Sequence, residues 1–319
     1  MSPKAANITY RCVYAVLLPV ALLPLPLLYV FSDILFVLIY YVVRYRRKLV
    51  RANMAISLAD RTEAERRSYE RRFYRNFADY VFETIKLLHI SDRQMERRFT
   101  FSGLEQITGS MDADRCVVAY FSHCFNWEWA PCITLYCGPQ LAAGDKFCQI
   151  YRPLRNRVFD RLMLKVRSRF HSVSIPKQLT LRHLLEMRRD DTVWVTGFMS
   201  DQKPSHGDAV HVIRFLGRAT AVITGTGQLA HRMGAKAVYW NMSKPKRGHY
   251  HIEVVTLSDN AAEADPLALT DRYFSLLEQN IRRDPSLWLW THNRWKGWAP
   301  DATVPGEAAP GVDNATKAE

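Results

Sequence analysis

The chain has a long apolar run near its N-terminus. Asp33 is the only formally charged residue between Cys12 and Val43. Because roughly 20 apolar residues cross the hydrocarbon core of a bilayer, the run is long enough to span a membrane. It is too long for a cleaved signal peptide and lacks a small-residue cleavage site, so we predict a retained anchor. Three prolines interrupt the run: Pro19, Pro24 and Pro26. A kinked helix or a re-entrant pair of helices therefore fits as well as one straight span.

A dense basic cluster follows the apolar run directly. Its members are Arg44, Arg46, Arg47, Lys48 and Arg51. Positive charge next to a span marks its cytoplasmic end. Each such charge near anionic headgroups also contributes about 1 kcal/mol to membrane binding. The cluster predicts that the rest of the chain lies on the cytoplasmic side, close to the membrane.

Beyond the basic cluster, the spacing of apolar residues alternates between helical and strand periods. Residues 59–90 repeat apolar positions at three- and four-residue intervals, which predicts an amphipathic helix facing a core or an acyl groove. Short apolar, β-branched and aromatic runs predict buried strands at 116–121, 147–151, 192–198, 236–241 and 250–257. Further helices are predicted at 155–167, 178–189, 219–233 and 267–283.

Strands that alternate with helices of this length indicate an α/β fold, with a mixed, mainly parallel sheet flanked by helices. We divide the chain into an anchor with its basic flank at 1–50 and one folded domain at 51–299. Residues 300–319 are rich in Ala, Pro and Gly without periodicity, and we expect a disordered tail there.

The charge balance narrows the class of partner. The chain of 319 residues has a net charge of +13, which suits an anionic partner such as nucleic acid or a phosphorylated lipid surface. Aromatic residues are not interleaved with basic ones as on a single-strand binding platform. Together with the anchor, this pattern favours the membrane and argues against nucleic acid.

Cysteine usage indicates a reducing compartment. There are six cysteines and no CxxC pair: Cys12, Cys116, Cys124, Cys132, Cys137 and Cys148. Five of them occupy apolar surroundings within one short region, which is typical of buried free thiols. A zinc site would require His or Cys ligands at regular spacing, and no such pattern is evident.

The strongest chemical signal follows the apolar run at 116–121. The segment FSHCFNWEWA places His123 where a strand gives way to a helix, with Glu128 five residues later. A carboxylate that holds one imidazole nitrogen leaves the other nitrogen free to deprotonate an alcohol. Two other interpretations remain open: His123 as a helix-capping residue with Glu128 stabilised by the helix dipole, and Cys124 as a nucleophile paired with His123.

Several segments together resemble a known family. They are YRRKLVRANMAIS, FYRNFADYVFETIKL, SHCFNWEWA, QIYRPLRNRVFDRLM, SDQKP, RFLGRATAVITGTGQLA and LWLWTHNRWKGW. Over about residues 40–298 the chain resembles the late acyltransferases of lipid A biosynthesis, within the lysophospholipid and glycerolphosphate acyltransferase superfamily. The resemblance implies a fatty acyl group donated by an acyl-carrier-protein thioester to a hydroxyl of a lipid A precursor. For this reaction we expect no acyl-enzyme, cofactor or metal. With the anchor and the basic cluster, we expect a location on the cytoplasmic face of the bacterial inner membrane.

The resemblance also implies roles for particular residues. His123 corresponds to the general base and Glu128 to its partner, and Arg152 in the YRP segment lies where a basic residue meets an acceptor phosphate or the oxyanion. A structural ion pair is the alternative for Arg152. Further residues expected to bind substrate are Asn126, Asn156, Asp201, Gln202 and Arg218.

The alternatives for these substrate-binding residues are ordinary structural ones. Asn156 and Asp160 share one helix face and position Arg152 or merely cap the helix. Asp201 holds Arg152, holds a substrate hydroxyl, or is a plain turn residue. Four tryptophans near the end of the chain form an interfacial belt or belong to the core: Trp288, Trp290, Trp295 and Trp298.

Two other functions compete with this interpretation. The nearest alternative is an acyltransferase that uses the same chemistry on glycerol phosphate or a lysophospholipid. The second, of a different class, is a nonenzymatic membrane protein that grips anionic lipid through its basic surface.

Overall fold

The computed structural model describes residues 3–205 and 210–296. The predicted tail at 300–319 and Trp298 lie outside these residues. The chain begins with α1 (Pro3–Leu22) and α2 (Leu25–Val37), which a π-helical turn η1 (Leu38–Val42) extends. The two helices meet at Pro24, the N-cap of α2, and Pro26 lies in the first turn of α2, where proline is well tolerated. Pro19 lies inside α1 and does not end it.

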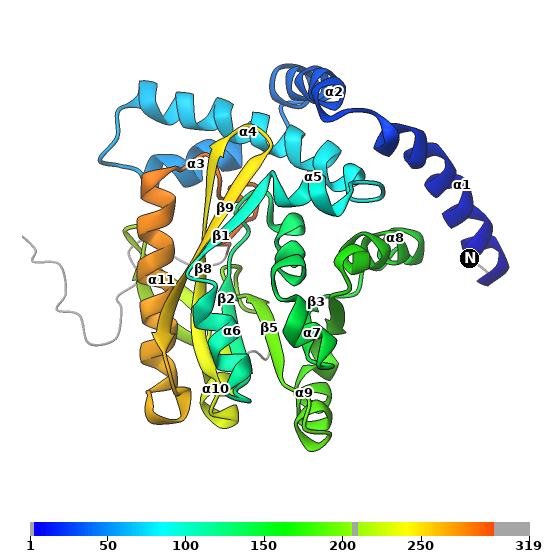
Figure 1. Cartoon of the computed structure of the whole chain (residues 1–319). Helices are drawn as coiled ribbons and strands as arrows, with labels where there is room; N and C mark the ends of the chain where they lie inside the picture. Colours follow the sequence, from blue (N-terminus) through cyan, green and yellow to red (C-terminus); the bar gives the residue numbers. More distant parts are fainter. Residues whose placement is uncertain (1–2, 206–209, 297–319) are drawn as a thin grey trace, which may run out of the picture.

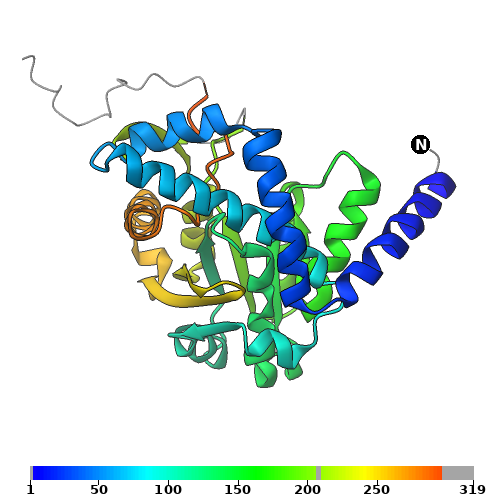
Figure 2. The same cartoon turned by 90° about the horizontal axis from the view of Figure 1, so that it is seen from above.

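Within the described residues, one helix is long and apolar enough to cross a membrane, from Leu25 to Val42. It is not surrounded by solvent on all sides, because α2 packs along α4 (Glu63–Lys86), and α1 packs against α8 (Arg157–Arg167) (Figure 1). Figure 2 shows α2, α3 (Arg47–Ser57) and α4 together across one end of the sheet.

Three members of the basic cluster are engaged in the fold. Arg47 and Arg51 both pair with the buried Glu70 of α4, with N–O distances of 3.2 and 2.8 Å. Arg46 donates to the backbone oxygen of Thr291 at 2.8 Å. The segment after the apolar run therefore ties the N-terminal helices to the domain, in addition to supplying positive charge.

A seven-stranded sheet forms the centre of the described part of the chain, in the order β1-β9-β8-β2-β5-β3-β4. Only β8 and β9 pair in antiparallel fashion, and the other neighbours are parallel. This confirms the predicted mixed, mainly parallel sheet flanked by helices. The strands of the sheet are β1 (Phe99–Ser102), β2 (Val117–Phe121), β3 (Lys146–Tyr151), β4 (Val173–Pro176), β5 (Trp194–Met199), β8 (Lys236–Lys246) and β9 (His249–Ser258).

Helices cover both faces of this sheet. Tyr120 stacks on Tyr273 of α11 (Pro266–Arg283) at a centroid distance of 4.8 Å. The next residue, Phe121, points to the opposite face because side chains alternate along a strand, and it packs near η2 (Trp127–Tyr136). The remaining helical segments are α5 (Asp92–Glu96), α6 (Glu105–Asp112), α7 (Gly138–Ala142), η3 (Ser168–Phe170), η4 (Lys177–Leu179), α9 (Thr180–Arg189), α10 (Gly225–Met233) and η5 (Ala261–Glu263).

The expected helix at 219–233 is partly wrong. A separate antiparallel hairpin occupies its beginning, formed by β6 (Val210–Phe215) and β7 (Arg218–Ile223). Leu216 and Gly217 connect the two strands, both with positive φ, which is the backbone conformation of a tight two-residue hairpin turn. The helix α10 begins only at Gly225.

Candidate active site

His123 and Asp201 meet at one edge of the sheet. The last residues of β2 and β5, Phe121 and Met199, are paired in a parallel register. Because parallel strands end at the same edge, the residues that follow them emerge side by side. His123 and Asp201 each come shortly after that pair, and this common position brings them into contact.

The contact is a set of short hydrogen bonds. His123 Nδ1 lies 2.7 Å from Asp201 Oδ1, and the His123 backbone N–H donates to Asp201 Oδ2 at 3.1 Å. Trp288 Nε1 donates to the same Oδ2 at 2.8 Å. Burial alone would raise the pKa of Asp201, but the attraction of His123 and these donors hold that pKa below its usual value. Asp201 is therefore a carboxylate that fixes the imidazole.

This pairing assigns the two nitrogens of the imidazole. A carboxylate at Nδ1 favours the proton on Nδ1, which leaves Nε2 as an acceptor. The Gln202 side-chain Nε2 lies 3.2 Å from His123 Nε2, and as an amide nitrogen it donates there. The His123 side chain is 16% exposed and that of Asp201 only 2%. The accepting nitrogen thus lies on the accessible side of the pair.

An extended segment after α11, residues 287–289, binds the backbone around His123. The backbone N–H of Leu289 donates to the His123 oxygen at 3.1 Å, and that of Phe125 donates to the Leu287 oxygen at 3.0 Å. Cys124 and Trp288 form an antiparallel bridge between the same segments. The backbone of the motif is therefore held by neighbours on both sides.

Glu128 does not contact His123, in contrast to the expected pair. Its Oε2 accepts from Arg167 Nε at 2.8 Å, and its Oε1 accepts from Arg167 Nη2 at 2.6 Å. Trp127 Nε1 adds a third bond to Oε1 at 3.1 Å. Arg167, at the end of α8, is thus a bidentate partner of a side chain that is only 3% exposed.

The local fold explains why Glu128 turns away. Asn126 is the N-cap of η2, and its Oδ1 accepts from the Glu128 backbone N–H at 3.1 Å. The chain therefore starts a tight helical turn immediately before Glu128 and directs that side chain toward α8. The Trp127 ring lies between the two sites, with its centroid 5.2 Å from that of His123. Trp127 touches both His123 and Glu128.

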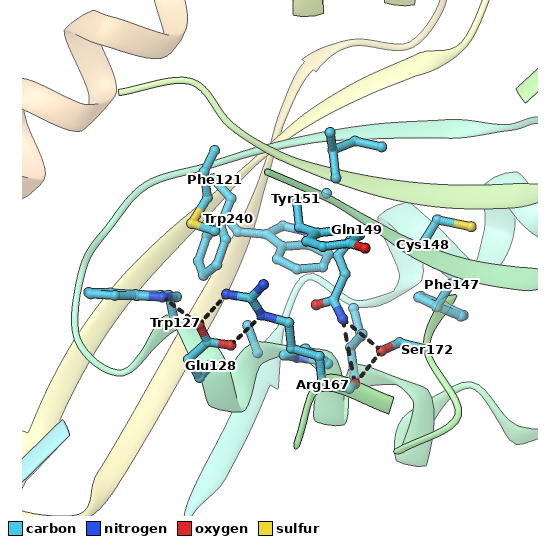
Figure 3. A pocket seen from close by; sticks show the side chains of 16 residues that line it. Phe121, Trp127, Glu128, Phe147, Cys148, Gln149, Tyr151, Arg167, Ser172 and Trp240 are labelled. Carbon is cyan, nitrogen blue, oxygen red and sulfur yellow. Dashed lines mark hydrogen bonds and ion pairs between the residues drawn. The ribbon is translucent and has the colours of Figure 1, made fainter. Parts of the chain in front are cut away.

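An apolar pocket adjoins the Glu128–Arg167 pair (Figure 3). Its walls come from β2, β3, β5, β8 and η2, and include Phe121, Trp127, Ile133, Ile150, Met199 and Trp240. Gln149 and Ser172 add a hydrogen-bonded polar edge, at 3.3 Å. The space inside is about 50 Å³, well below the roughly 300 Å³ of small ligand-binding pockets, so a long ligand requires the walls to separate.

Three residues expected to bind substrate lie elsewhere. Arg152 is exposed beyond the end of β3 and is not among the residues that line the pocket. Asn156 caps α8, where its Oδ1 accepts from the backbone N–H groups of Val158 and Phe159 at 3.0 and 3.3 Å. Arg218 is buried in β7 and packs over the Trp295 ring at 4.4 Å. Asn156 thus has a capping role, and the described contacts join none of the three to His123.

Arg167 is a candidate functional residue that the sequence did not reveal. It lies in a region with several arginines, including Arg155, Arg157, Arg161 and Arg169, and no spacing distinguishes it from them. Burial against Glu128 sets it apart in the structure. Burial lowers the pKa of Arg167, but the hydrogen bond and the charge of Glu128 outweigh this and raise that pKa. The guanidinium therefore stays charged at the pocket.

Cys124 has the wrong environment for a nucleophile. It is fully buried next to Ser122, and burial raises the pKa of its thiol to about 12. A reactive cysteine needs its thiolate form at neutral pH, which this environment opposes. Among the residues described, no group of His, Cys, Asp or Glu is arranged to hold a metal ion.

The described tryptophans at the C-terminal end belong to the core. Trp288, Trp290 and Trp295 are all buried, and the Trp288 ring contacts the other two at centroid distances of 4.9 and 6.1 Å. They do not form an interfacial belt. Instead, their cluster carries the indole that bonds Asp201.

Comparisons with known proteins show the family of the chain. The family described as bacterial lipid A biosynthesis acyltransferase matches residues 4–297. The chain is 23% identical over 275 residues to the lipid A biosynthesis lauroyltransferase of Escherichia coli strain K12, covering 86% of this chain and 87% of that protein. It is 21% identical over 252 residues to the palmitoleoyltransferase of the same strain, covering 79% of each.

A lipid A biosynthesis acyltransferase of Haemophilus influenzae is 22% identical over 264 residues, covering 82% of this chain and 80% of that protein. The family match extends over the N-terminal helices, the HxxxxE segment and the whole sheet. The chain belongs to the bacterial lipid A biosynthesis acyltransferase family.

Proposed function

We propose that this acyltransferase moves a fatty acyl chain from an acyl-carrier-protein thioester to a hydroxyl of a lipid A precursor. The observation that carries the proposal is His123 held by Asp201, with its ring centroid 5.2 Å from that of Trp127, which lines the apolar pocket. A base separated from an apolar pocket by one aromatic ring suits an alcohol acceptor and a fatty acyl donor. The family and the named relatives support the lipid A class of acceptor.

In the proposed reaction, His123 accepts a proton from the acceptor hydroxyl at Nε2. Asp201 holds Nδ1–H and stabilises the imidazolium that forms. The hydroxyl oxygen attacks the thioester carbonyl, the carbon–sulfur bond breaks, and the imidazolium returns the proton to the departing thiolate. The Gln202 amide stands where the hydroxyl would bind and has to move aside. The step uses no acyl-enzyme.

Glu128 and Arg167 have a different task in this proposal. The negative charge on the thioester oxygen in the transition state needs a fixed positive partner, and such electrostatic stabilisation is often worth roughly 3 kcal/mol per donor. Arg167 is a charged guanidinium at the pocket wall, and Glu128 holds its plane by two hydrogen bonds. Glu128 therefore assists by orienting Arg167 instead of holding His123.

The proposed location is the inner membrane, with the domain on its cytoplasmic face. Support comes from the apolar helix at Leu25–Val42 and from the basic residues that follow it. The exposed face of that helix carries Leu27, Val30, Ile34 and Val37. A lipid acceptor and an enzyme held at the same surface meet by diffusion in two dimensions.

The test is an acyl-transfer assay with the full chain in proteoliposomes. Acyl-carrier-protein thioesters of several chain lengths are supplied, with the matching coenzyme A thioesters as a donor control. Acceptors are lipid A precursors with and without attached sugar, lysophosphatidate and glycerol 3-phosphate. We expect mass spectrometry to find one added acyl ester on a lipid A precursor, formed from the carrier-protein donor.

Other outcomes of this assay separate the alternatives. Transfer only to lysophosphatidate or glycerol 3-phosphate would indicate a lysophospholipid or glycerolphosphate acyltransferase. Vesicle binding without any transfer, unchanged by Glu128→Gln, would favour a nonenzymatic lipid-binding protein. Either result contradicts the proposal.

A further inference from the structure

Glu83 is a fully buried carboxyl group for which the proposed reaction has no use. It lies in the last turns of α4 and receives three side-chain hydrogen bonds. Tyr29 donates to Oε1 at 2.9 Å, while Asn126 and Tyr250 donate to Oε2 at 3.0 and 2.7 Å. Within the described residues, all its hydrogen-bonding side chains are neutral. A buried carboxyl group without a bonded cation is costly, so its retention calls for an explanation.

One of the three donors belongs to the active-site motif. Asn126 lies between His123 and Glu128, is fully buried, and uses both ends of its amide. Its Nδ2 donates to Glu83, and its Oδ1 accepts from the Glu128 backbone N–H. Because Glu83 accepts at the nitrogen end, it fixes which way the amide faces. The first turn of η2, and with it the direction of Glu128, depends on that orientation.

A second donor comes from the N-terminal helix. Tyr29 lies on α2, within the segment long enough to span a membrane. The same helix bonds α4 a second time, where Ser32 Oγ donates to Asp79 Oδ1 at 2.7 Å. Tyr29 fits because the turn between β8 and β9 has a glycine, Gly248, at φ +70°, and a Cβ there would overlap the Tyr29 hydroxyl. These contacts fix the position of α2 relative to Glu83.

We infer that Glu83 is a positioning residue that links the N-terminal helix, through Tyr29 and Asn126, to the Glu128–Arg167 pair. The chain of contacts runs from α2 to α4, to the N-cap of η2 and to the end of α8. Glu83 does not line the pocket and its side chain has no hydrogen bond to His123, so the carboxyl group acts on the motif through Asn126. The inference rests on the proposed function, because it gives Glu128 and Arg167 a part in acyl transfer.

The test exchanges the carboxyl and the amide between positions 83 and 126. Asn126→Asp places two carboxyl groups face to face and removes the donor. Because small misplacements of an active-site group are costly, we expect kcat to fall by roughly tenfold to a hundredfold. The KM for the acyl donor should stay unchanged. Glu83→Gln alone keeps an acceptor for Asn126 and should retain kcat to within about threefold.

The double variant Glu83→Gln/Asn126→Asp restores one amide and one carboxyl group with the direction of the bond reversed. We expect kcat to recover to within about threefold of wild type. If the effects of the two single substitutions were additive, the double variant would not recover. The matched control is Asn76→Asp, another buried asparagine of α4, whose amide donates to Ser286. That change should alter the melting temperature and leave the kcat of the folded protein unchanged.

Three results would overturn the inference: wild-type kcat in Asn126→Asp, a folded double variant that stays inactive, or an equal loss of kcat in Asn76→Asp. Crystal structures of wild type and Asn126→Asp supply a readout that does not need turnover. We expect the Glu128–Arg167 hydrogen bonds to be broken in the single variant and present in the double variant. If wild type transfers no acyl chain, the proposed function fails, while an intact Glu128–Arg167 pair in Asn126→Asp would separately refute the positioning role.

Discussion

Two carboxylates reach the active site by different routes. Asp201 follows β5 and meets His123 because β2 and β5 end together in a parallel register. Glu128 follows His123 closely along the chain, yet it turns into η2 and binds Arg167. The partner of His123 is therefore determined by which strands end side by side in the sheet, and not by distance along the chain.

The two pairs also differ in what they offer a substrate. The His123–Asp201 pair leaves a nitrogen accessible, and the carboxylate behind it is buried. In the Glu128–Arg167 pair both charges are largely buried and each satisfies the other. In the proposed reaction the first pair exchanges a proton, and the second holds a fixed guanidinium beside the pocket.

The largest effect is expected from removing the base. His123→Ala should lower kcat by roughly 10⁴-fold, because general base catalysis is lost while the fold persists. Turnover per folded enzyme in proteoliposomes measures this, and circular dichroism checks the fold. His183→Ala on the surface of α9 is the matched control and should keep full activity. Wild-type turnover in His123→Ala would remove the foundation of the proposed mechanism.

A smaller loss, roughly 10³-fold in kcat, is expected for Asp201→Asn. The asparagine amide would donate to His123 Nδ1, which moves the ring proton to Nε2 and blocks the nitrogen that should accept. Steady-state kinetics give the loss, and nitrogen NMR of labelled histidine reports the tautomer. If Asp201→Asn stays fully active, then Asp201 is not the partner of the base.

Substitutions in the Glu128–Arg167 pair should lower kcat less than those in the His123–Asp201 pair. Glu128→Ala is expected to lower kcat by roughly 10²-fold, because Arg167 loses the two bonds that orient it. It should also destabilise the fold, because it leaves a buried guanidinium unpaired, by about 3 kcal/mol or more. Replacing both partners, with Glu128→Leu and Arg167→Met, should recover stability in a denaturant titration but not activity. Recovery of both would assign the pair a purely structural role.

The next prediction concerns stability at different pH values. Burial raises the pKa of Glu83 above that of an unfolded glutamate, with Lys244 lowering it and Asp79 raising it. The protonated group therefore favours the folded state below about pH 4.3, and this contribution is lost as pH rises through the raised pKa. In Glu83→Gln no such loss occurs. We expect the free energy of unfolding of the variant, relative to wild type, to increase with pH, and a constant difference would contradict this.

The smallest effect is expected at Cys124. Because the pKa of its buried thiol is about 12, no thiolate is available for attack at neutral pH. Cys124→Ala should therefore keep kcat to within about twofold. An inactive but folded Cys124→Ala, or an acyl group found on Cys124 by mass spectrometry, would reinstate a covalent mechanism.

Much of the fold follows from periodicity in the sequence. The runs that predicted strands at 116–121, 147–151 and 250–257 became β2, β3 and β9, and the long amphipathic pattern became α4. The hairpin of β6 and β7 was not predicted. Its second strand, RATAVI, is separated from α10 by a single residue, and the two segments together have the pattern of one helix. Short edge strands such as β1 and β4 owe their structure to pairing partners that are distant in the sequence.

The candidate site was predictable only in part. His123 could be found because it follows a buried strand, and Asp201 and Gln202 because they end another. The pairing of His123 with Asp201 requires knowing that β2 and β5 are neighbours, which no local pattern contains. Arg167 and Glu83 stand out by their burial, which a sequence does not show, whereas Arg152 was expected in the site from the resemblance of the YRP segment.

The tight turn before β9 has a consequence for how the N-terminal segment can be replaced. Gly248 leaves a vacancy in the hairpin that the phenol of Tyr29 fills, so the helix and the domain fit as a matched pair. A foreign apolar helix of equal length would still hold the protein at a bilayer. It would not fill that vacancy, and tethering alone would therefore not substitute for the native helix.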